Sequence, residues 1–461
     1  MVVRFDLGRS ATDLVLVTKV NGRDWHVFRQ FKPLLRRLAQ QILVRGPSNI
    51  RNTVDAALGG PVITLFSAVV TLAAVMLSAL ALMYCLQALL AILPMRGVVA
   101  PVRAEGERGR VGIVVPAHNE SAGIGALLAM LREQLREGDR LIVVADNCTD
   151  DTAAVARSFG ATVLEREHET ERGKGYALDH GVRFLERDPP EIVVFLDADS
   201  LIEKDTLSVL AETCHRLGRP VQAKYLMTPQ AGSRIDAPVA CFGLLVKNHV
   251  RLLGLRKLGV PSHITGSGFA CPWGVIRDVE LANGHLAEDK KLGLDLTVAG
   301  YPPYYCEDAA VWSDVPYTAK GTRTQRDRWE RGHLSLVRAA PRYMLEAFRH
   351  RDAGLFLLAI DTAVPPMFLL IFVLAITALV ALPIALFGGA ILPFWIASLT
   401  LCLVLLSTVA IWWMLGRSLL PVRSLPGLLP FVASKIAIYA GGALRSSAGQ
   451  WIRTDRSKGE N

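Results

Sequence analysis

The sequence predicts an α/β domain with a largely parallel sheet, flanked by helices that cross a membrane. Uncharged apolar runs occupy residues 61–94 and much of the chain after residue 354, whereas residues 108–335 have the mixed, charged composition of a soluble domain. Within this middle stretch, short β-branched runs alternate with amphipathic stretches. That alternation is typical of parallel strands connected by helices.

Residues 1–60 form a basic N-terminal region that lacks the pattern of a secretory signal. Two short β-like pieces, Val2–Leu7 and Leu14–Val20, precede a helical pattern over residues 25–44. That helix would be amphipathic and basic. It would suit an anionic membrane surface or packing on the soluble domain, and both alternatives stay open.

The apolar runs are long enough for several membrane spans, because one transmembrane helix needs about 20 residues. Residues 61–95 predict one long, tilted span, and residues 336–363 an interfacial segment. Residues 364–444 predict about three further spans, near 364–387, 390–415 and 425–444, before a tail at 445–461. The sequence therefore predicts a multi-pass protein of the cell membrane.

The loop Gly416–Ser424 carries Arg417 and Arg423, so the positive-inside rule places it, together with the soluble domain, on the cytosolic side. A single span at 61–95 would put the basic residues 1–60 outside, against the same rule. Either the positive-inside rule fails for residues 1–60, or the apolar run 61–95 does not cross the membrane as a simple single span.

Charge and cysteine content exclude other classes of protein. The net charge of +9 suits lysines and arginines beside anionic lipid, and no basic run is interleaved with aromatic residues. A nucleic-acid partner is therefore not expected. The seven cysteines are scattered and form no CxxC pair, so neither a disulfide framework nor a zinc site is indicated.

Polar motifs follow the predicted strands, at the sheet edge where parallel α/β domains bind their ligands. The strands are expected at Val111–Pro116, Leu141–Ala145, Ala161–Leu164 and Ile192–Leu196. The last of these delivers Asp197 and Asp199 to the same side of its carboxyl end. Two neighbouring carboxylates repel unless a cation neutralises them, and Mg²⁺ usually binds one or two carboxylates plus substrate phosphates. A simple helix cap by Asp199 is the alternative.

Three further motifs weaken that alternative because they occupy successive elements. Val115–Glu120 (VPAHNE) ends the first strand, and Val144–Thr152 (VADNCTDDT) ends the second. Arg172–Gly175 (RGKG) then opens a helix, where glycines permit close backbone approach and a lysine favours phosphate.

In this order the motifs resemble the family 2 inverting glycosyltransferases with a GT-A fold, over residues 108–335. Leu286–Asp289 (LAED) is similar to the family's Glu-Asp motif, whose aspartate is the general base. Gln325–Trp329 (QRDRW) matches the Q-x-x-R-W motif and is similar to that of hyaluronan, chitin and cellulose synthases. The resemblance implies a Rossmann-like GT-A domain in the cytosol and a nucleotide diphosphate sugar donor, with a UDP-sugar favoured. It also implies Mg²⁺ or Mn²⁺ as cofactor.

The resemblance implies donor-binding roles for the residues that match these motifs. The nucleotide sugar would be bound by Pro116, Ala117, Asn119, Glu120, Asp146, Lys174, Asp197, Gln325 and Arg328. Lys174, Gln325 and Arg328 would meet the diphosphate. Asp197 and Asp199 would hold the metal ion.

On the acceptor side, Asp289 would remove the proton of the acceptor hydroxyl. Trp329 would stack on the acceptor sugar, with a membrane-interface anchor as its alternative role. Gly266 and Ser267 lie in a loop similar to the one that precedes the family's base. Lys290 and Lys291 depart from the family's pattern and leave the identity of the acceptor open.

The sequence thus leads to the hypothesis of a membrane glycosyltransferase that extends an extracellular or capsular polysaccharide with inversion. Its partners would be a glycan or lipid-linked acceptor and membrane lipid. One alternative is transfer of a single sugar to a polyprenyl-linked intermediate, and another is a non-catalytic membrane scaffold. A transporter would need buried polar residues and repeats in its spans, and only Asp361 qualifies.

Overall fold

The computed structural model describes residues 2–7, 14–20, 23–25, 60–94, 108–229, 234–282, 285, 287–315 and 319–434. The chain divides into two compact units. The first comprises residues 1–75 with 376–397, and the second comprises residues 76–375 with 398–461.

The first unit contains a small antiparallel sheet with strand order β1-β2-β3. Its strands are β1 (Val2–Leu7), β2 (Leu14–Val20) and β3 (Arg23–Trp25). The two β-like pieces predicted from the sequence are therefore strands, and they pair with each other. The amphipathic helix predicted over residues 25–44 lies outside the described residues.

The second unit is built on an eight-stranded sheet with strand order β6-β5-β4-β7-β10-β9-β11-β8. Its strands are β4 (Val111–Ala117), β5 (Arg140–Asp146), β6 (Thr162–Arg166), β7 (Ile192–Phe195), β8 (Ser200–Ile202), β9 (Val221–Thr228), β10 (Phe269–Pro272) and β11 (Tyr304–Asp314). The first four in this order run parallel, as the βαβ rhythm predicted. β10 is antiparallel to both of its neighbours, and this mixed half of the sheet positions the 265–268 loop.

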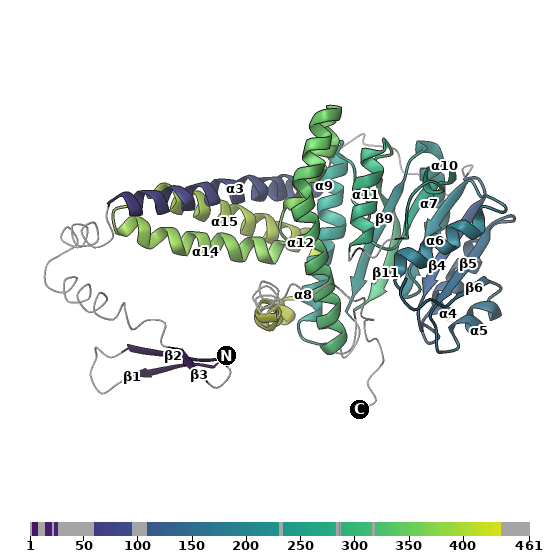
Figure 1. Ribbon diagram of the computed structural model, residues 1–461, viewed down its shortest axis with the longest axis horizontal. Helices are drawn as coiled ribbons and strands as arrows, with labels where there is room; N and C mark the ends of the chain where they lie inside the picture. Colours follow the sequence, from purple (N-terminus) through teal and green to yellow (C-terminus); the bar gives the residue numbers. More distant parts are fainter. Residues whose placement is uncertain are drawn as a thin grey trace. The chain divides into compact units, whose positions relative to one another are not determined.

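The inner parallel strands β4, β5 and β7 are almost continuous apolar runs, as expected where helices cover both faces of a sheet. One face of β4, including Ile113 and Val115, packs with α4 and α7. The other face, including Val114, packs with α6 and α11, and these layers can be followed in Figure 1. Gly181 of α6 permits this contact, because a Cβ there would lie 2.5 Å from Val114.

The helices around this sheet are α4 (Ile124–Gln134), α5 (Thr152–Ser158), α6 (Lys174–Leu185), α7 (Thr206–Leu217), α8 (Ala237–Leu245), α9 (Arg251–Lys257), α10 (Trp273–Ile276), α11 (Glu288–Val298), α12 (Ala319–His350) and α13 (Ala353–Ala363). A π-helical segment, η1 (Val246–Val250), joins α8 to α9. Such segments are rare and often occur at functional sites. α12 runs through residue 335, where the sequence predicted a domain boundary.

Within the described ranges, three helices are long and apolar enough to cross a membrane: Val62–Ile92, Met367–Leu386 and Leu392–Gly416. They belong to α3 (Gly60–Ile92), α14 (Met367–Leu386), and α15 (Leu392–Ile411) with η2 (Trp412–Gly416). The 3₁₀ segment η3 (Val422–Gly427) follows. The further span predicted at 425–444 is described only to residue 434.

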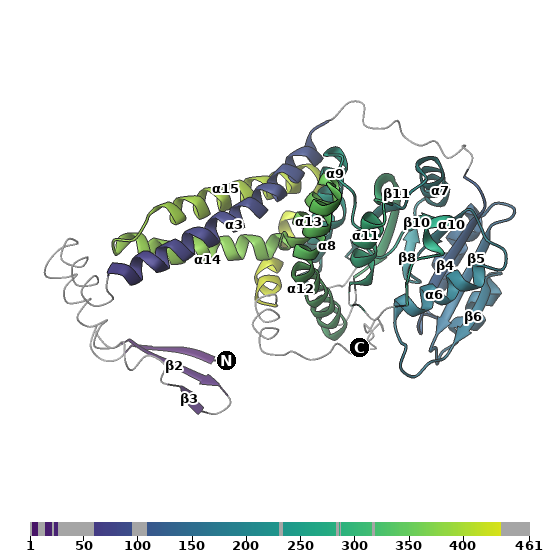
Figure 2. The same ribbon diagram turned by 45° about the horizontal axis from the view of Figure 1, so that its top comes forward.

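A second apolar cluster in the second unit joins residues of α3 and α15 to the helices that follow the sheet. Tyr84 of α3 hydrogen-bonds Thr408 of α15 (3.0 Å), and Ser78 hydrogen-bonds Thr400 (2.8 Å). Residues of α12 and α13 belong to this cluster, and Figure 2 shows these two helices side by side. The segment predicted to be interfacial therefore belongs to a helical layer that packs on the α/β domain.

Candidate active site

A cavity of about 360 Å³ lies at the carboxyl ends of the parallel strands. Residues from the ends of β4 and β5, from the start of α6, and from η1, α11, α12 and α14 line it. The cavity brings the strand-end residues, such as Asp197, together with residues more than a hundred positions later in the sequence, such as Arg328. A cavity at this edge is where an α/β domain is expected to bind a ligand.

The turns after β4 and β5 hold each other in place. Asn119 and Asn147 both adopt positive φ, at 56° and 51°, a conformation that asparagine tolerates better than most residues. The Asn119 side-chain oxygen accepts a hydrogen bond from the backbone N–H of Thr149 (2.7 Å). Asp146 accepts one from Arg166 (2.8 Å) and lines the cavity. The two turns therefore form a fixed wall.

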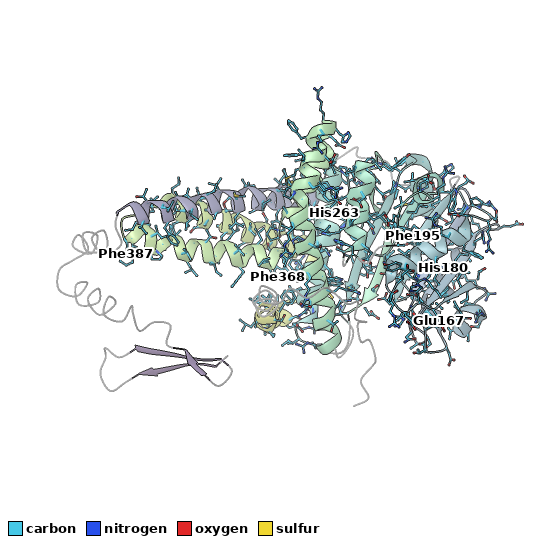
Figure 3. All side chains as sticks on the ribbon, in the orientation of Figure 1. Glu167, His180, Phe195, His263, Phe368 and Phe387 are labelled. Carbon is cyan, nitrogen blue, oxygen red and sulfur yellow. The ribbon has the colours of Figure 1, made fainter. Side chains whose placement is uncertain are left out.

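Asp197 follows β7, whose last residue, Phe195, is labelled in Figure 3. Lys174, the first residue of α6, forms an ion pair with Asp197 (2.5 Å) and donates a hydrogen bond to the carbonyl of Gly266 (2.8 Å). Burial opposes the charge of this lysine, but Asp197 and Glu288 outweigh it and raise its pKa. Lys174 thus connects Asp197 to the 265–268 loop.

Ser267 lies behind the cavity wall and fixes the loop to the sheet. Its hydroxyl accepts a hydrogen bond from the backbone N–H of Asp197 (3.0 Å) and hydrogen-bonds Ser200 (2.7 Å). Gln222 of β9 donates to the Ser267 carbonyl and accepts from the backbone N–H of Thr265, both at 2.9 Å. Because these partners are buried, the loop has a defined position next to Asp197.

Asp289 lies in the first turn of α11, opposite this loop. A Cβ added at Gly266 would be 3.4 Å from the Asp289 carboxylate, so the glycine leaves room beside that group. Burial and the neighbouring Asp289 raise the pKa of Glu288 despite the opposing charge of Lys174. Asp289 lines the cavity. One of its carboxylate oxygens accepts a hydrogen bond from the backbone N–H of Lys290 (2.8 Å).

The Q-x-x-R-W residues lie along α12. Gln325 and Arg328 are three residues apart, which places them on one helical face, and both line the cavity with Trp329. The intervening Arg326 also lines the cavity, where it pairs with Asp236 (2.8 Å) and lies 4.7 Å from the ring centre of Phe431. The motif therefore supplies both cavity groups and an anchor for the helix.

The structure brings most of the predicted site residues to this one cavity. Those that line it are Pro116, Ala117, Glu120, Asp146, Lys174, Asp197, Asp199, Gly266, Asp289, Gln325, Arg328 and Trp329. Asn119 and Ser267 do not line it, and they support the turns that do. The roles assigned to all of these residues remain predictions.

Sequence reasoning missed three basic residues in the cavity wall: Lys247 of η1, Arg251 of α9 and His333 of α12. For His333 the spacing was a usable signal, because it follows Trp329 by one helical turn and the two share a helical face. Lys247 lies in the π-helical η1, where the α-helical interval does not define a face. Lys290, which departs from the family's pattern, also lines the cavity.

Asp361 of α13, the charged residue that stood out in the apolar C-terminal part, is buried in a polar network. Its carboxylate accepts hydrogen bonds from Arg251 (2.7 Å), from His263 (2.8 Å) and from Gln87 of α3 (2.6 Å). Burial lowers the pKa of His263 to about 4, so the neutral ring donates from Nε2. Figure 3 labels His263 in the segment before the 265–268 loop. Asp361 therefore connects three elements of the second unit.

Residues 108–332 match the family model described as glycosyltransferase like family 2. A probable glycosyltransferase of Bacillus subtilis, YdaM, is 28% identical over 246 residues, which cover 50% of this chain and 57% of that protein. A 4,4'-diaponeurosporenoate glycosyltransferase of Staphylococcus aureus is 38% identical over 100 residues, or 21% of this chain and 26% of that protein. The chain thus spans little more than half the length of the first relative.

Among solved structures, the mannosyltransferase PcManGT of Pyrobaculum calidifontis, in complex with GDP-Man and Mn²⁺, is similar over 84% of this chain and 100% of that one. The TM-score is 0.50 and the sequence identity 19%, so this likeness concerns the fold. The domain has a GT-A-like, Rossmann-like α/β fold. The match of residues 108–332 to the glycosyltransferase family 2 model, together with the glycosyltransferase relatives, supports a transferase enzyme.

Proposed function

We propose that this protein transfers a sugar, with inversion, from a nucleotide diphosphate sugar to an acceptor at a membrane. One observation carries the proposal: a single cavity gathers Asp197, Asp289 and Arg328 from three separate elements. These are the groups that a displacement at an anomeric carbon needs near the leaving diphosphate and the incoming hydroxyl. The GDP-Man bound by the P. calidifontis enzyme supports a nucleotide sugar donor.

The donor set fits a divalent cation. Asp197 and Asp199 offer hard carboxylate oxygens, which Mg²⁺ and Mn²⁺ prefer. No group of three or more histidine, cysteine or acidic side chains suited to a metal occurs within the described ranges, so diphosphate oxygens would complete the coordination. When bound, the ion supplies positive charge to the leaving diphosphate. Lys174 would then share Asp197 with it or move onto the phosphates.

The chain's own residues account for the chemical step. Asp289 takes the proton of the acceptor hydroxyl as that oxygen bonds to the anomeric carbon. The bond from the anomeric carbon to the diphosphate oxygen breaks, and the electron pair leaves with the nucleoside diphosphate. Gln325 and Arg328 donate hydrogen bonds to the charge that develops there. With one base and no protein nucleophile, a single displacement inverts the anomeric centre.

The acceptor could be a growing polysaccharide, as the Q-x-x-R-W motif suggests, or one lipid-linked molecule. The cavity favours the second, because Met367, Phe368 and Leu369 of α14 form part of its wall. The S. aureus relative, whose name states that it glycosylates 4,4'-diaponeurosporenoate, supports a small acceptor as well. The carboxylates and Arg328 are intact, which argues against a non-catalytic scaffold.

The three long apolar helices support a multi-pass membrane protein, and the basic loop before η3 supports a cytosolic catalytic domain. Asp278 is exposed on this domain, so a cysteine placed there reports its side of the membrane. A membrane-impermeant maleimide should label the Asp278→Cys protein in lysed cells only. Labelling in intact cells would reverse this topology.

A panel of nucleotide sugars, scored for nucleotide release by the purified full-length protein, tests the proposed activity. One donor should be turned over with Mn²⁺, and chelation should stop the reaction. Asp199→Asn should reduce release to background, whereas Asp278→Asn, on the surface, should match the parent. Full activity of Asp199→Asn in the presence of chelator would rule out the metal-assisted reaction.

A further inference from the structure

The cavity contains a second set of charged groups that the proposed donor site does not use. We call it the basic cluster: Lys247, Arg251, Lys290 and His333, from η1, α9, α11 and α12. Its members lie close enough to influence one another. Burial and the charges of Lys247 and Arg251 lower the pKa of Lys290. Burial and the charges of all three residues lower the pKa of His333. Four elements therefore converge on this part of the cavity.

The basic cluster is separate from the donor-side charges. Glu288 interacts with Lys174 and Arg328, which belong to the donor side. The charge of Asp289 favours the charged form of both Lys174 and Lys290. The proposed base therefore lies at the junction of the two sets, with the donor on one side and the basic cluster on the other.

Two members of the basic cluster have their charge compensated or suppressed within the protein. Arg251 is neutralised by Asp361 at 2.7 Å, and burial with the nearby cations lowers the pKa of His333 well below its usual range. The Lys247 ammonium lies 5.5 Å from the ring centre of Trp329. The Lys290 ammonium forms no ion pair or hydrogen bond with another side chain in the part of the chain that the structure describes. A bound anion would compensate this positive charge.

An apolar wall adjoins the basic cluster. Met367, Phe368 and Leu369 open α14 and line the cavity together with Leu244 of α8 and Phe431. The Phe368 and Phe431 rings pack at 4.7 Å between centroids, and Figure 3 labels Phe368 at the start of its helix. Since α14 is apolar and long enough to cross a membrane, the wall is continuous with a surface suited to lipid.

We propose that the acceptor is an amphiphile whose anionic group is bound by Lys290 and Lys247 and whose apolar chain lies along this wall. A hydroxyl next to the anion would then face Asp289, which takes its proton, and the oxygen bonds to the anomeric carbon as the nucleoside diphosphate leaves. This inference rests on the proposed glycosyl transfer and names the class of its acceptor. A neutral glycan would leave the Lys290 ammonium without an ion pair and would gain little from Phe368.

The anion could be a phosphate or a carboxylate, and matched probes distinguish these sources. 1-Oleoyl lysophosphatidic acid and 1-monooleoylglycerol share a chain and a hydroxyl but differ in the phosphate. 3-Hydroxyhexadecanoate and its methyl ester differ in the carboxylate charge. Binding of each lipid to the detergent-solubilised full-length protein is measured without donor, so that it does not depend on catalysis.

At least one anionic probe should bind about tenfold or more tightly than its neutral partner, the size expected of hydrogen bonds to a charged group. Lys290→Met should abolish this preference and leave nucleotide binding unchanged. Lys291→Met is the control, because Lys291 pairs with Asp295 (2.5 Å) and does not line this cavity. It should keep the preference.

Equal binding within both probe pairs, or a preference that survives in Lys290→Met, would overturn the inference. Either result would leave the proposed function standing if the donor panel still shows metal-dependent nucleotide release. Conversely, the protein could show a Lys290-dependent preference for the anionic lipid but release nucleotide from none of the tested donors. That result would support the lipid site and contradict the proposed reaction. A melting temperature for each variant shows that loss of binding is not loss of folding.

Discussion

The two sides of the cavity are constructed differently. On the proposed donor side, side chains project from the ends of buried parallel strands, and the backbone N–H of Asp197 donates a hydrogen bond to the buried Ser267 hydroxyl. On the proposed acceptor side, the polar groups come from four helical elements, and one of them, Arg251, pairs with Asp361 in a fifth. A strand-end site suits a ligand common to many enzymes, whereas a helical wall can change with the acceptor. We infer that the sheet sets the donor chemistry and the helices select the acceptor.

Replacing Asp289, which lies between the two sides of the cavity, should have the largest effect on sugar transfer. Asp289→Asn keeps the shape of the side chain but cannot accept a proton at neutral pH. Transfer should fall by roughly 10²–10⁴, the range for a lost general base, while nucleotide and lipid binding persist. Product formation and equilibrium nucleotide binding are measured on the same preparation. Near-parental transfer would mean that the base lies elsewhere, and lost nucleotide binding would move Asp289 to the donor side.

The acceptor side should depend on Asp361 for its stability. Asp361→Ala leaves the buried Arg251 without its carboxylate partner, and breaking a buried pair in this way costs about 3–5 kcal/mol. A thermal melt of the detergent-solubilised protein measures the change. Asp352→Ala, at the start of the same helix, is the control. Its carboxylate only caps α13 through the backbone N–H of Leu355, a contact worth about 1 kcal/mol. Similar melting shifts for both variants would contradict a special role for the Asp361 network.

The preference for an anionic lipid should decrease with rising pH. Burial, followed by Lys247 and Arg251, lowers the pKa of Lys290 to about 7, against the opposing effects of Asp361 and Asp289. His333, from α12, also faces this group and is neutral in this range. Lys290 is therefore charged below about pH 7 and loses its charge above it.

Binding of 3-hydroxyhexadecanoate relative to its methyl ester, measured at pH 6 and pH 8.5, checks this sign. Because a detergent surface raises the pKa of a long-chain carboxylic acid, Lys290→Met is measured at both pH values and shows how much of any change comes from the probe's own charge. The preference should be several-fold larger at the lower pH, and Lys290→Met should show a small ratio at both pH values. A preference that grows with pH in the parent protein would assign anion binding to another group.

The donor side could be predicted from the sequence because its signals are local. Buried parallel strands are continuous apolar runs, so the polar residues that end them, such as Asp146 and Asp197, mark the ligand edge without further information. The spacing of Gln325 and Arg328 likewise places them on one helical face. The supporting role of Ser267 was not visible, because it depends on a hydrogen bond between residues 70 positions apart.

The acceptor side could not be predicted because its contacts are distant in sequence. Arg251 and Asp361 are 110 residues apart, and nothing local to Asp361 indicates a buried ion pair rather than a transport site. Lys247 lies in the π-helical η1, whose irregular geometry no periodicity predicts. The mixed half of the sheet was also missed, since β8 has only three residues and pairs with β11, a hundred residues later.

The claim that one cavity binds two substrates through separate groups is tested most directly by a cross-comparison. Affinity for the nucleotide that the donor panel selects, with Mn²⁺, and the preference for an anionic lipid are both measured in Asp199→Asn and Lys290→Met. Asp199→Asn should weaken nucleotide binding and keep the lipid preference. Lys290→Met should lose the lipid preference and keep the parent's nucleotide affinity. If either folded variant loses both affinities together, the two sides are not separate and the account is wrong.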